Sequence, residues 1–262
     1  MLKIIDISEA NGIIYWPDVK NQIDGVILRV GYRGYGAAGS LMFDRLFHHN
    51  VAYLQSLGIP FGVYWLSQAV SVDEAVAEAD FIHEHIKHYT LHLPVFLDSE
   101  WGDANGGTGR ADRISRNART EYALALLRRL RELGYDTGLY TGVYWFRDEL
   151  DGEAIRADGH HIWLASVENV EPAIPYDAWQ YSWKGTLDGI NTDVDMNQFK
   201  PSLMRSMGKY YMDTAGHWAE EAIDKVTDAG LMKGKADKRF DPDSPMTRAE
   251  VATVLARMLD RM

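Results

Sequence analysis

The sequence predicts an α/β fold: a closed barrel of eight strands with an incomplete outer ring of helices, followed by a small helical domain. Three observations support this prediction. Strand-like apolar runs alternate with amphipathic helical stretches up to about residue 155, three more strand-like runs follow with short connections, and the pattern changes again after residue 200. Alternation of strand and helix indicates parallel pairing, and eight such strands are enough to close a barrel.

The expected strands are short runs of apolar, β-branched and aromatic residues. They cover residues 3–8, 25–30, 61–66, 93–98, 137–142, 161–166, 178–183 and 193–199. The clearest helices cover residues 44–57, 72–88 and 113–133, and the last of them is followed by Gly134, a residue that commonly ends helices. We therefore expect a barrel domain over residues 1–200, a linker over 201–209 and a second domain over 210–262.

Composition limits the classes of protein that fit. The 262 residues are 46 % hydrophobic, enough for one large and one small domain, and they include no cysteine for disulfides, thiolate metal sites or nucleophilic catalysis. The net charge is −11, and −10 of it falls on residues 1–208, so nucleic acid is not an expected partner. No run approaches the ~20 apolar residues of a membrane span, and MLKIIDIS meets an acidic residue too early for a secretory signal. We expect no membrane partner and synthesis in the cytoplasm.

The stretch PVFLDSEW (94–101) places two carboxylates directly after a buried strand. Side chains two apart on a strand point to the same side, so Asp98 and Glu100 share one face at a spacing of about 6.6 Å. Repulsion between the two charges, together with desolvation, keeps a proton on one of them to unusually high pH. Such a pair predicts an acid beside a base, although Asp-x-Glu alone also fits two surface acids at the start of a loop.

Further acids and several aromatic residues are expected at the same rim. Asp6 closes the first strand, and Asp193 and Asp195 lie on the eighth, which neighbours the first in a closed barrel. In such barrels the carboxyl ends of the strands form the active site. The aromatic residues on the intervening strands are Tyr64, Trp65, Tyr140, Trp163, Trp179 and Tyr181. Each one alone fits barrel packing, but acids among aromatic rings predict a carbohydrate cleft, because sugars present apolar C–H faces to such rings.

Over roughly residues 3–200 the chain resembles glycoside hydrolase family 25, the Chalaropsis-type lysozymes. The resemblance rests on an ordered set of segments: DIS (6–8), LRVGY (28–32), FDRLFHHN (43–50), LGIPFGVYW (57–65), DSE (98–100), LYTG (139–142), IWLAS (162–166), WQYS (179–182) and VDMNQF (194–199). It implies a TIM-like barrel of five β/α units plus three strands, (β/α)5(β)3. It also implies a muramidase without cofactor that cleaves the β-1,4 bond between N-acetylmuramic acid and N-acetylglucosamine in peptidoglycan.

The resemblance also implies roles for individual residues. Glu100 matches the general acid and Asp98 its partner, while Asp6 and Asp195 match two further acids of the family's site. The substrate contacts expected from it are Arg29, Tyr64, Tyr140, Trp163, Trp179 and Tyr181. The carboxyl spacing lies at the border between a covalent intermediate and inversion. A third route uses the substrate's 2-acetamido oxygen as the nucleophile, and we expect this route, with Asp98 orienting the acetamido group.

The C-terminal stretch resembles an S-layer homology motif over about fifty residues. The matching segments are HWAEEAI (217–223), GLMKG (230–234), FDP (240–242) and MTRAE (246–250). Such motifs bind secondary polymers of Gram-positive cell walls, usually as three copies, so a single copy implies self-association, most simply as a trimer, or a docking remnant. The residues that match wall-polymer contacts are Trp218, Arg248 and Glu250. Alternatively, Trp218 is a core residue and Arg248 and Glu250 only cap a helix that begins with a Thr247–Glu250 capping box.

Two further motifs are assigned no chemistry. The histidines of HEHIKHYTLH (83–92) lack acids or cysteines at ligand spacing, so no metal is expected. The glycines of DANGGTGR (103–110) lack the lysine of a phosphate-binding loop, and a flexible loop beside the cleft is the expectation.

Two functions of different classes fit the sequence: a muramidase targeted by its tail, and a non-catalytic wall-binding protein whose barrel only holds glycan. The intact set of acids favours the muramidase. The lack of an export signal fits a phage or prophage endolysin of a Gram-positive host, which acts on the wall after holin-type release or lysis.

Overall fold

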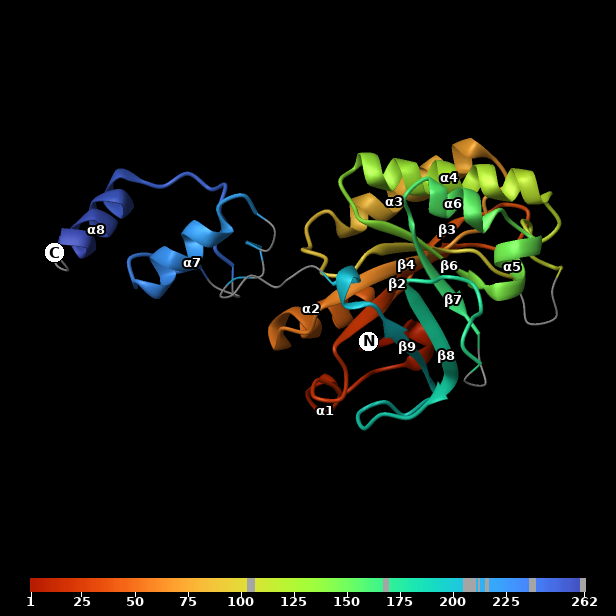
Figure 1. Cartoon of the computed structure of the whole chain (residues 1–262), viewed down its shortest axis with the longest axis horizontal. Coiled ribbons are helices and arrows are strands. Elements are labelled where there is room, and N and C mark those ends of the chain that lie inside the picture. Colours follow the sequence, from red (N-terminus) through yellow and green to blue (C-terminus); the bar gives the residue numbers. More distant parts are fainter. Residues whose placement is uncertain are drawn as a thin grey trace. The chain divides into compact units, whose positions relative to one another are not determined.

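The computed structural model describes residues 1–102, 107–166, 170–204, 211, 213–214, 217–235 and 239–259. The chain divides into two compact units, residues 1–204 and residues 205–262. In Figure 1 the first unit runs from red to teal and the second is blue.

The described part of the first unit contains a single nine-stranded sheet that closes into a barrel (Figure 1). Its strands are β1 (Leu2–Ile7), β2 (Gly25–Arg33), β3 (Leu41–Phe43), β4 (Phe61–Leu66), β5 (Val95–Asp98), β6 (Thr137–Gly142), β7 (His161–Ala165), β8 (Ala178–Gly185) and β9 (Val194–Phe199). The strand order is β1-β9-β8-β7-β6-β5-β4-β2-β3, and pairing of β1 with β2 closes a ring of eight. The predicted eight-stranded barrel is confirmed, and β3 is an addition whose only partner among the described strands is β2.

The direction of the strands decides which ends meet. The barrel strands β1, β2, β4, β5, β6, β7 and β8 pair with one another in parallel, whereas β9 is antiparallel to both β8 and β1, and the additional β3 is antiparallel to β2. The amino end of β9 therefore lies at the rim where the other barrel strands have their carboxyl ends. Asp193, which was predicted on this strand, is instead an exposed residue just before it, because β9 begins at Val194.

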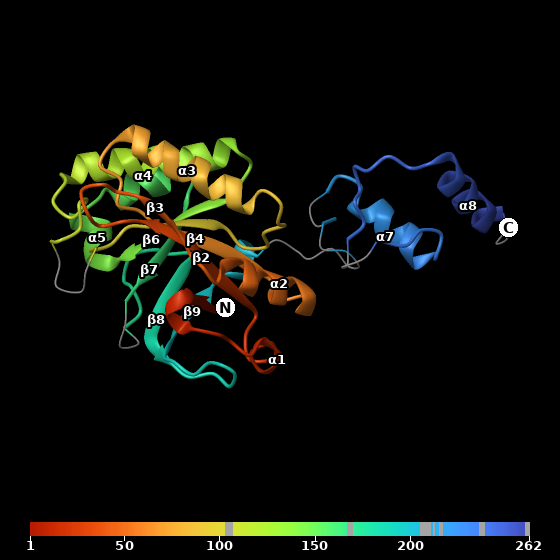
Figure 2. The ribbon, with the colours of Figure 1, turned by 180° about the vertical axis from the view of Figure 1, so that it is seen from behind.

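Helices cover only part of the barrel. They are α1 (Trp16–Val19), α2 (Phe47–Leu57), α3 (Val72–Ile86), α4 (Arg116–Glu132), α5 (Val143–Asp148) and α6 (Gly152–Ala157), with short 3-10 turns η1 (Glu9–Asn11) and η2 (Pro201–Leu203). Serines cap the two longest: Ser71 accepts from the Glu74 N–H and Ser115 from the Ala118 N–H. The three predicted helices are confirmed as α2, α3 and α4. Figure 2 shows α3 and α4 side by side on the outside of the sheet.

Alternation along the strands separates two hydrophobic cores. One lies between the strands and the outer helices, and the other fills the barrel interior, where Phe96, Trp163 and Phe199 pack edge to face. Gly138 leaves room for this packing, since a Cβ atom there would lie 2.4 Å from the Phe96 ring. The apolar interior of the barrel thus packs directly beneath the side chains at the carboxyl rim.

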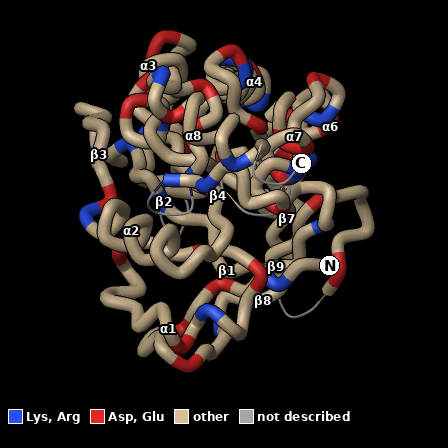
Figure 3. Tube along the Cα trace, turned by 90° about the vertical axis from the view of Figure 1, so that its left-hand side faces the viewer, with Lys and Arg blue, Asp and Glu red and all other residues tan. Residues whose placement is uncertain are grey.

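The surface of the barrel mixes charges of both signs. Figure 3 shows acidic and basic residues close together on α3, α4 and α6. Arg128 and Arg131 on α4 both pair with Asp158, at 2.6 and 2.9 Å, and Arg129 pairs with Asp80 at 2.8 Å. Among the described helices, none combines the length and the apolar character needed to span a membrane.

The second unit contains two described helices, α7 (Glu220–Asp228) and α8 (Arg248–Leu259). Helix α7 begins at Glu220, after Asp213, whose carboxylate accepts the N–H groups of Phe240 and Asp241, both at 2.8 Å. The linker predicted over 201–209 differs at its start. Residues 201–203 form η2, and Leu203 packs into the barrel core. Residues 205–210 lie outside the described residues.

Candidate active site

Four carboxyl groups meet in one cavity at the carboxyl rim of the barrel. Asp6, Asp98, Glu100 and Asp195 line a space of about 220 Å³. Asp6 comes from β1, Asp98 ends β5, and Asp195 comes from the amino end of β9, which reaches this rim because the strand is antiparallel. The remaining lining residues are Tyr64, Tyr140, Trp163, Gln180 and Trp183. The predicted juxtaposition of these four acids is therefore present in the structure.

Asp6 is the most heavily hydrogen-bonded of the four acids. Its Oδ2 atom accepts from Asn197 Nδ2 at 2.8 Å and from Gln180 Nε2 at 3.2 Å, and its carboxyl group shares a hydrogen bond with Asp195. A second layer holds these amides in place: Trp163 Nε1 donates to Asn197 Oδ1 at 3.0 Å, and the Tyr140 hydroxyl donates to Gln180 Oε1 at 2.8 Å. The aromatic residues of the barrel thus orient the amides that orient Asp6.

Burial changes the protonation of the acids. It raises the pKa of Asp195 to about 8, with the charge of Asp6 and their shared hydrogen bond acting in the same direction. Burial and then the charge of Asp6 raise the pKa of Glu100 to about 7. Burial also raises the pKa of Asp6, although the hydrogen bonds from Asn197 and Gln180 oppose this change. Glu100 therefore keeps its proton under mildly acidic conditions, as a general acid must.

Asp98 is the most deeply placed partner of Glu100. Its side chain is 3 % exposed, and its Oδ1 atom has no hydrogen-bond partner among the described residues. Burial raises the pKa of Asp98 well above its ordinary value, the charges of Glu100 and Asp6 add to this, and Arg29 opposes it. Asp98 lines the cavity, so its carboxyl group is placed to accept a hydrogen bond from a ligand that supplies a donor.

Among the predicted substrate contacts, Tyr64, Tyr140 and Trp163 line the cavity, but others do not. On β8 the Gln180 side chain enters the barrel, so its neighbours Trp179 and Tyr181 point to the opposite face, where their rings pack together at 5.8 Å. Arg29 also lies outside the cavity lining, since its guanidinium pairs with Asp44 at 2.9 Å and Glu9 at 3.5 Å. Trp65 is fully buried in the core that faces the helices.

Candidate contacts in the second unit are all on its surface. Trp218 is 90 % exposed, so it is not a core residue, and Arg248 and Glu250 are exposed as well. Glu250 accepts from the Thr247 N–H at 2.7 Å and Thr247 Oγ1 accepts from the Glu250 N–H at 3.2 Å, which confirms the predicted capping box. A larger cavity of about 530 Å³ lies in the same unit, and three of its lining residues are the cations Lys233, Lys235 and Arg257.

The family model for glycosyl hydrolases family 25 matches residues 5–190, more than two thirds of the chain. The chain belongs to glycosyl hydrolases family 25. This result confirms the resemblance found in the sequence, and it covers every strand of the barrel except β9 and the start of β1.

Solved structures agree with the family 25 assignment. The modular autolysin LytC from Streptococcus pneumoniae is 30 % identical, with a TM-score of 0.63 over 75 % of this chain and 46 % of LytC. Two others share the fold at lower identity. The spore cortex lytic enzyme SleM from Clostridium perfringens is 22 % identical (TM-score 0.65, over 78 % of this chain and 69 % of that one). A muramidase from Trichobolus zukalii is 21 % identical (TM-score 0.62, over 78 % and 95 %).

The second unit matches a different model, that of the S-layer homology domain, over residues 211–252. Its relatives include Cell surface glycoprotein 1 of Acetivibrio thermocellus, 47 % identical over 53 residues, and Outer membrane protein SlpA of Deinococcus radiodurans, 44 % identical over 48 residues. These matches cover 20 % and 18 % of this chain but only 2 % and 4 % of those proteins. A family 25 barrel is therefore joined here to one S-layer homology domain.

Sequence reasoning missed three residues of the family 25 site: Gln180, Trp183 and Asn197. Asn197 lies two positions after Asp195 on β9, so the strand period alone places both on one face. Gln180 is flanked by Trp179 and Tyr181, and the period of two also requires that it point away from them. Trp183 is 53 % exposed at the mouth of the cavity, although it has the parity of Trp179 and Tyr181, because the register of β8 with β9 shifts after Gln180 and the period of two does not extend to it. Among the described residues, no group of three or more histidine or acidic side chains is placed to hold a metal ion.

Proposed function

We propose that the barrel is a muramidase that cleaves the β-1,4 bond between N-acetylmuramic acid and N-acetylglucosamine in peptidoglycan. The observation that carries the proposal is the cavity in which Glu100, with a pKa near 7, lies beside Asp98 with its unpartnered Oδ1. Membership of family 25 and the likeness to the autolysin LytC support the same substrate class.

The proposed chemistry depends on the different protonation states of the two acids: Glu100 carries a proton, whereas Asp98 is ionised. Glu100 gives its proton to the glycosidic oxygen as the bond from that oxygen to the sugar C1 breaks. The carbonyl oxygen of the substrate's 2-acetamido group forms the new bond to C1, and the acetamido N–H donates to the carboxylate of Asp98. This hydrogen bond favours the ionised form of Asp98. Water then forms a bond to C1 as the bond from C1 to the acetamido oxygen breaks, and it gives a proton to Glu100, so the acetamido group is restored and the anomeric configuration is retained.

Mass spectrometry of digested peptidoglycan tests the proposed bond. New reducing ends on N-acetylmuramic acid are expected, and reducing ends on N-acetylglucosamine would contradict the assignment. Proton NMR of the first released anomer tests the assisted route: an initial β product agrees with it, whereas an initial α product excludes it and leaves inversion.

Glu100→Gln separates the enzyme from the alternative, a non-catalytic glycan-binding protein. The amide keeps the shape of the side chain but has no acidic proton, so clearing of a wall suspension should fall by about 10³-fold or more, while sedimentation with walls persists. A variant that clears walls as fast as the parent would show that Glu100 is not the acid.

For the second unit we propose binding to a secondary cell-wall polymer, with self-association as a trimer. The match to the S-layer homology model, the exposed Trp218 and the cavity, whose lining carries both cations and the acids Asp241 and Glu250, support binding. The apolar face of α8 supports association, because Val251, Leu255, Met258 and Leu259 are all exposed on it. Trp218→Ala should weaken sedimentation with walls without changing hydrolysis of soluble glycan. Leu255→Gln should convert trimers to monomers in analytical ultracentrifugation, and a parent chain that is already monomeric would end the trimer proposal.

Synthesis in a host cytoplasm and release to the wall as a phage or prophage endolysin stays a prediction. Its test is expression inside a Gram-positive host with and without a holin, since lysis should require the holin.

A further inference from the structure

The segment that carries Glu100 is held on its amino-terminal side by β6. The Ser99 N–H donates to the carbonyl of Tyr140 at 3.1 Å, and Thr141 Oγ1 donates to the carbonyl of Ser99 at 2.7 Å. These bonds fix the peptide that directly precedes Glu100. Since β5 ends at Asp98, the strand ladder does not hold the chain beyond this point.

On the carboxyl-terminal side of Glu100, a buried carboxylate holds the backbone. Asp112 is 3 % exposed, and its Oδ1 atom accepts from the Gly102 N–H at 2.9 Å. Its Oδ2 atom accepts from the N–H groups of Gly107 at 3.0 Å and Gly109 at 2.8 Å. One side chain thus ties the chain two residues after Glu100 to the returning segment. Carboxylates that accept several backbone N–H groups form strong, charge-assisted hydrogen bonds.

This arrangement explains the glycines that resemble a phosphate-binding loop in the sequence. A Cβ atom at Gly109 would lie 2.6 Å from Gln68 Oε1 and 2.7 Å from Asp112 Oδ1, and one at Gly102 would lie 2.9 Å from the Gly109 Cα. Only glycine allows the backbone to approach the carboxylate so closely. Backbone N–H groups in such a loop surround an anion, and here the anion is the chain's own Asp112. Residues 103–106, part of the loop predicted to be flexible, lie outside the described residues.

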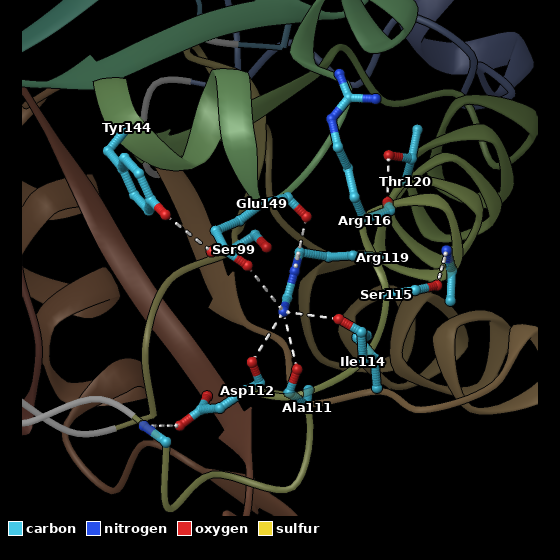
Figure 4. A network of polar contacts seen from close by, with 12 residues as sticks. Ser99, Ala111, Asp112, Ile114, Ser115, Arg116, Arg119, Thr120, Tyr144 and Glu149 are labelled. Carbon is cyan, nitrogen blue, oxygen red and sulfur yellow. Dashed lines mark hydrogen bonds and ion pairs between the residues drawn. The ribbon is translucent and has the colours of Figure 1, made fainter.

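Helix α4 fixes the position of Asp112 itself. Figure 4 shows the guanidinium of Arg119 surrounded by main-chain carbonyls, and it donates to those of Ala111 at 2.9 Å and Asp112 at 3.2 Å. Arg119 is 5 % exposed and lies 4.2 Å above the ring of Trp145, which in turn packs edge to face against Trp101 at 5.1 Å. The residues on either side of Glu100 and Trp101 are therefore both held in place: Ser99 by β6, and Gly102 by Asp112, which α4 positions in turn.

We propose that Asp112 is a positioning residue for Glu100: by holding the Gly102 N–H it fixes the backbone that aims Glu100 into the cavity. The proposal rests on the proposed function of Glu100 as the acid. The groups that face Glu100 across the cavity are Asp6, Asp98, Asp195, Tyr64 and Tyr140, with Arg29 close to Asp98. When the backbone at Gly102 is released, Glu100 moves out of this buried, negatively charged surrounding into water, and its affinity for a proton decreases.

Asp112→Asn tests the proposal with little change in shape. An amide has only one acceptor oxygen, and the two N–H groups of Gly107 and Gly109 hold it in preference to the single N–H of Gly102, which therefore loses its partner. In carbon-13 NMR titrations of labelled glutamate side chains, the pKa of Glu100 should fall from about 7 toward its ordinary value. At pH 6 kcat on peptidoglycan fragments should fall about tenfold or more, with KM nearly unchanged, because the substrate contacts remain.

Asp158→Asn is the matched control. Asp158 is bound by Arg128 and Arg131 and lies two residues before His160, next to the amino end of β7 and so at the rim opposite the cavity. This variant should lose stability without moving the Glu100 titration. An unchanged Glu100 titration in folded Asp112→Asn would overturn the proposal.

If Asp112→Asn does not fold, Arg119→Lys replaces it, since lysine keeps the charge but lacks the planar fork that reaches both carbonyls. The Glu100 titration should then shift in the same direction by a smaller amount, and no shift would overturn the proposal. The NMR titration needs no substrate, so it separates this inference from the proposed function: a parent enzyme that fails to cleave peptidoglycan contradicts only the latter.

Discussion

Asp6 and Asp195 are direct partners across the antiparallel pair of β1 and β9, and their carboxyl groups share one hydrogen bond. A hydrogen bond between two carboxyl groups requires one proton. Asn197 and Gln180 donate to Asp6, which favours its ionised form, so Asp195 holds the proton. The pair therefore presents one negative charge to Glu100, and that charge helps Glu100 to remain protonated.

Replacing Asp195 by Asn should increase stability while decreasing activity. The folded pKa of Asp195, about 8, is above its unfolded value, so its contribution is fully present below the unfolded pKa and is lost as pH rises toward 8. Asn does not titrate, so the advantage of Asp195→Asn should grow from pH 4 to pH 8, to on the order of 5 kcal/mol. Urea unfolding at both pH values measures it. Asp193→Asn, at an exposed position two residues earlier, is the control and should change neither stability nor activity.

Wall hydrolysis should decrease as pH rises through about 7, because Glu100 must be protonated to donate. The measurement is kcat/KM on soluble peptidoglycan fragments from pH 4 to 9 at constant ionic strength. A rate that stays level up to pH 9 would contradict the assignment of Glu100 as the group that titrates.

Tyr140→Phe should reduce kcat by about tenfold, because it removes the hydroxyl that orients Gln180, which in turn donates to Asp6. Burial raises the pKa of Tyr140 well above 10, so this hydroxyl keeps its proton throughout the working range. Tyr181→Phe is the matched control, since that ring lies on the other face of β8 and packs against Trp179. Equal losses in both variants would show that the hydroxyl of Tyr140 has no particular role.

Trp183→Ala should raise KM for glycan by about tenfold with a smaller change in kcat. The indole is half-exposed at the mouth of the cavity, where it offers an apolar face to a sugar ring away from the reacting bond. Trp183→Phe keeps an aromatic face and should retain most of the affinity. Isothermal titration with a non-cleaved oligosaccharide and Glu100→Gln as the background measures binding alone.

The barrel could be predicted because its strands are buried on both faces and read as apolar runs between glycines and prolines. The shorter elements could not be predicted in the same way. β3 has three residues, and α5 and α6 have six each, which is too few for a period to be recognised. Helix ends differed for a local reason, as at α4, which begins at Arg116 instead of residue 113 because the side chain of Ser115 caps it.

The acids of the site were predictable because each stands at or near a strand end, but their supporting residues were not. Strand periodicity places Trp179 and Tyr181 on one face of β8 and Gln180 on the other, but it does not say which face points inward. The two aromatic residues were predicted to face the cleft, but Gln180 is the residue that points inward, where it donates a hydrogen bond to Asp6. Asp112 lies outside any strand, and its role depends on three backbone N–H groups brought together only in the folded chain.

The antiparallel β9 has a consequence for how the cleft can change during evolution. The connection between β8 and β9, residues 186–193, starts on the catalytic side of the barrel, and its Leu187 and Ile190 are buried in the core. The Gly189 carbonyl accepts from the Tyr15 N–H at 2.9 Å, so this connection also packs against the segment after β1. Insertions or deletions beside Trp183 must therefore preserve that packing, which limits how far this side of the barrel can vary among descendants.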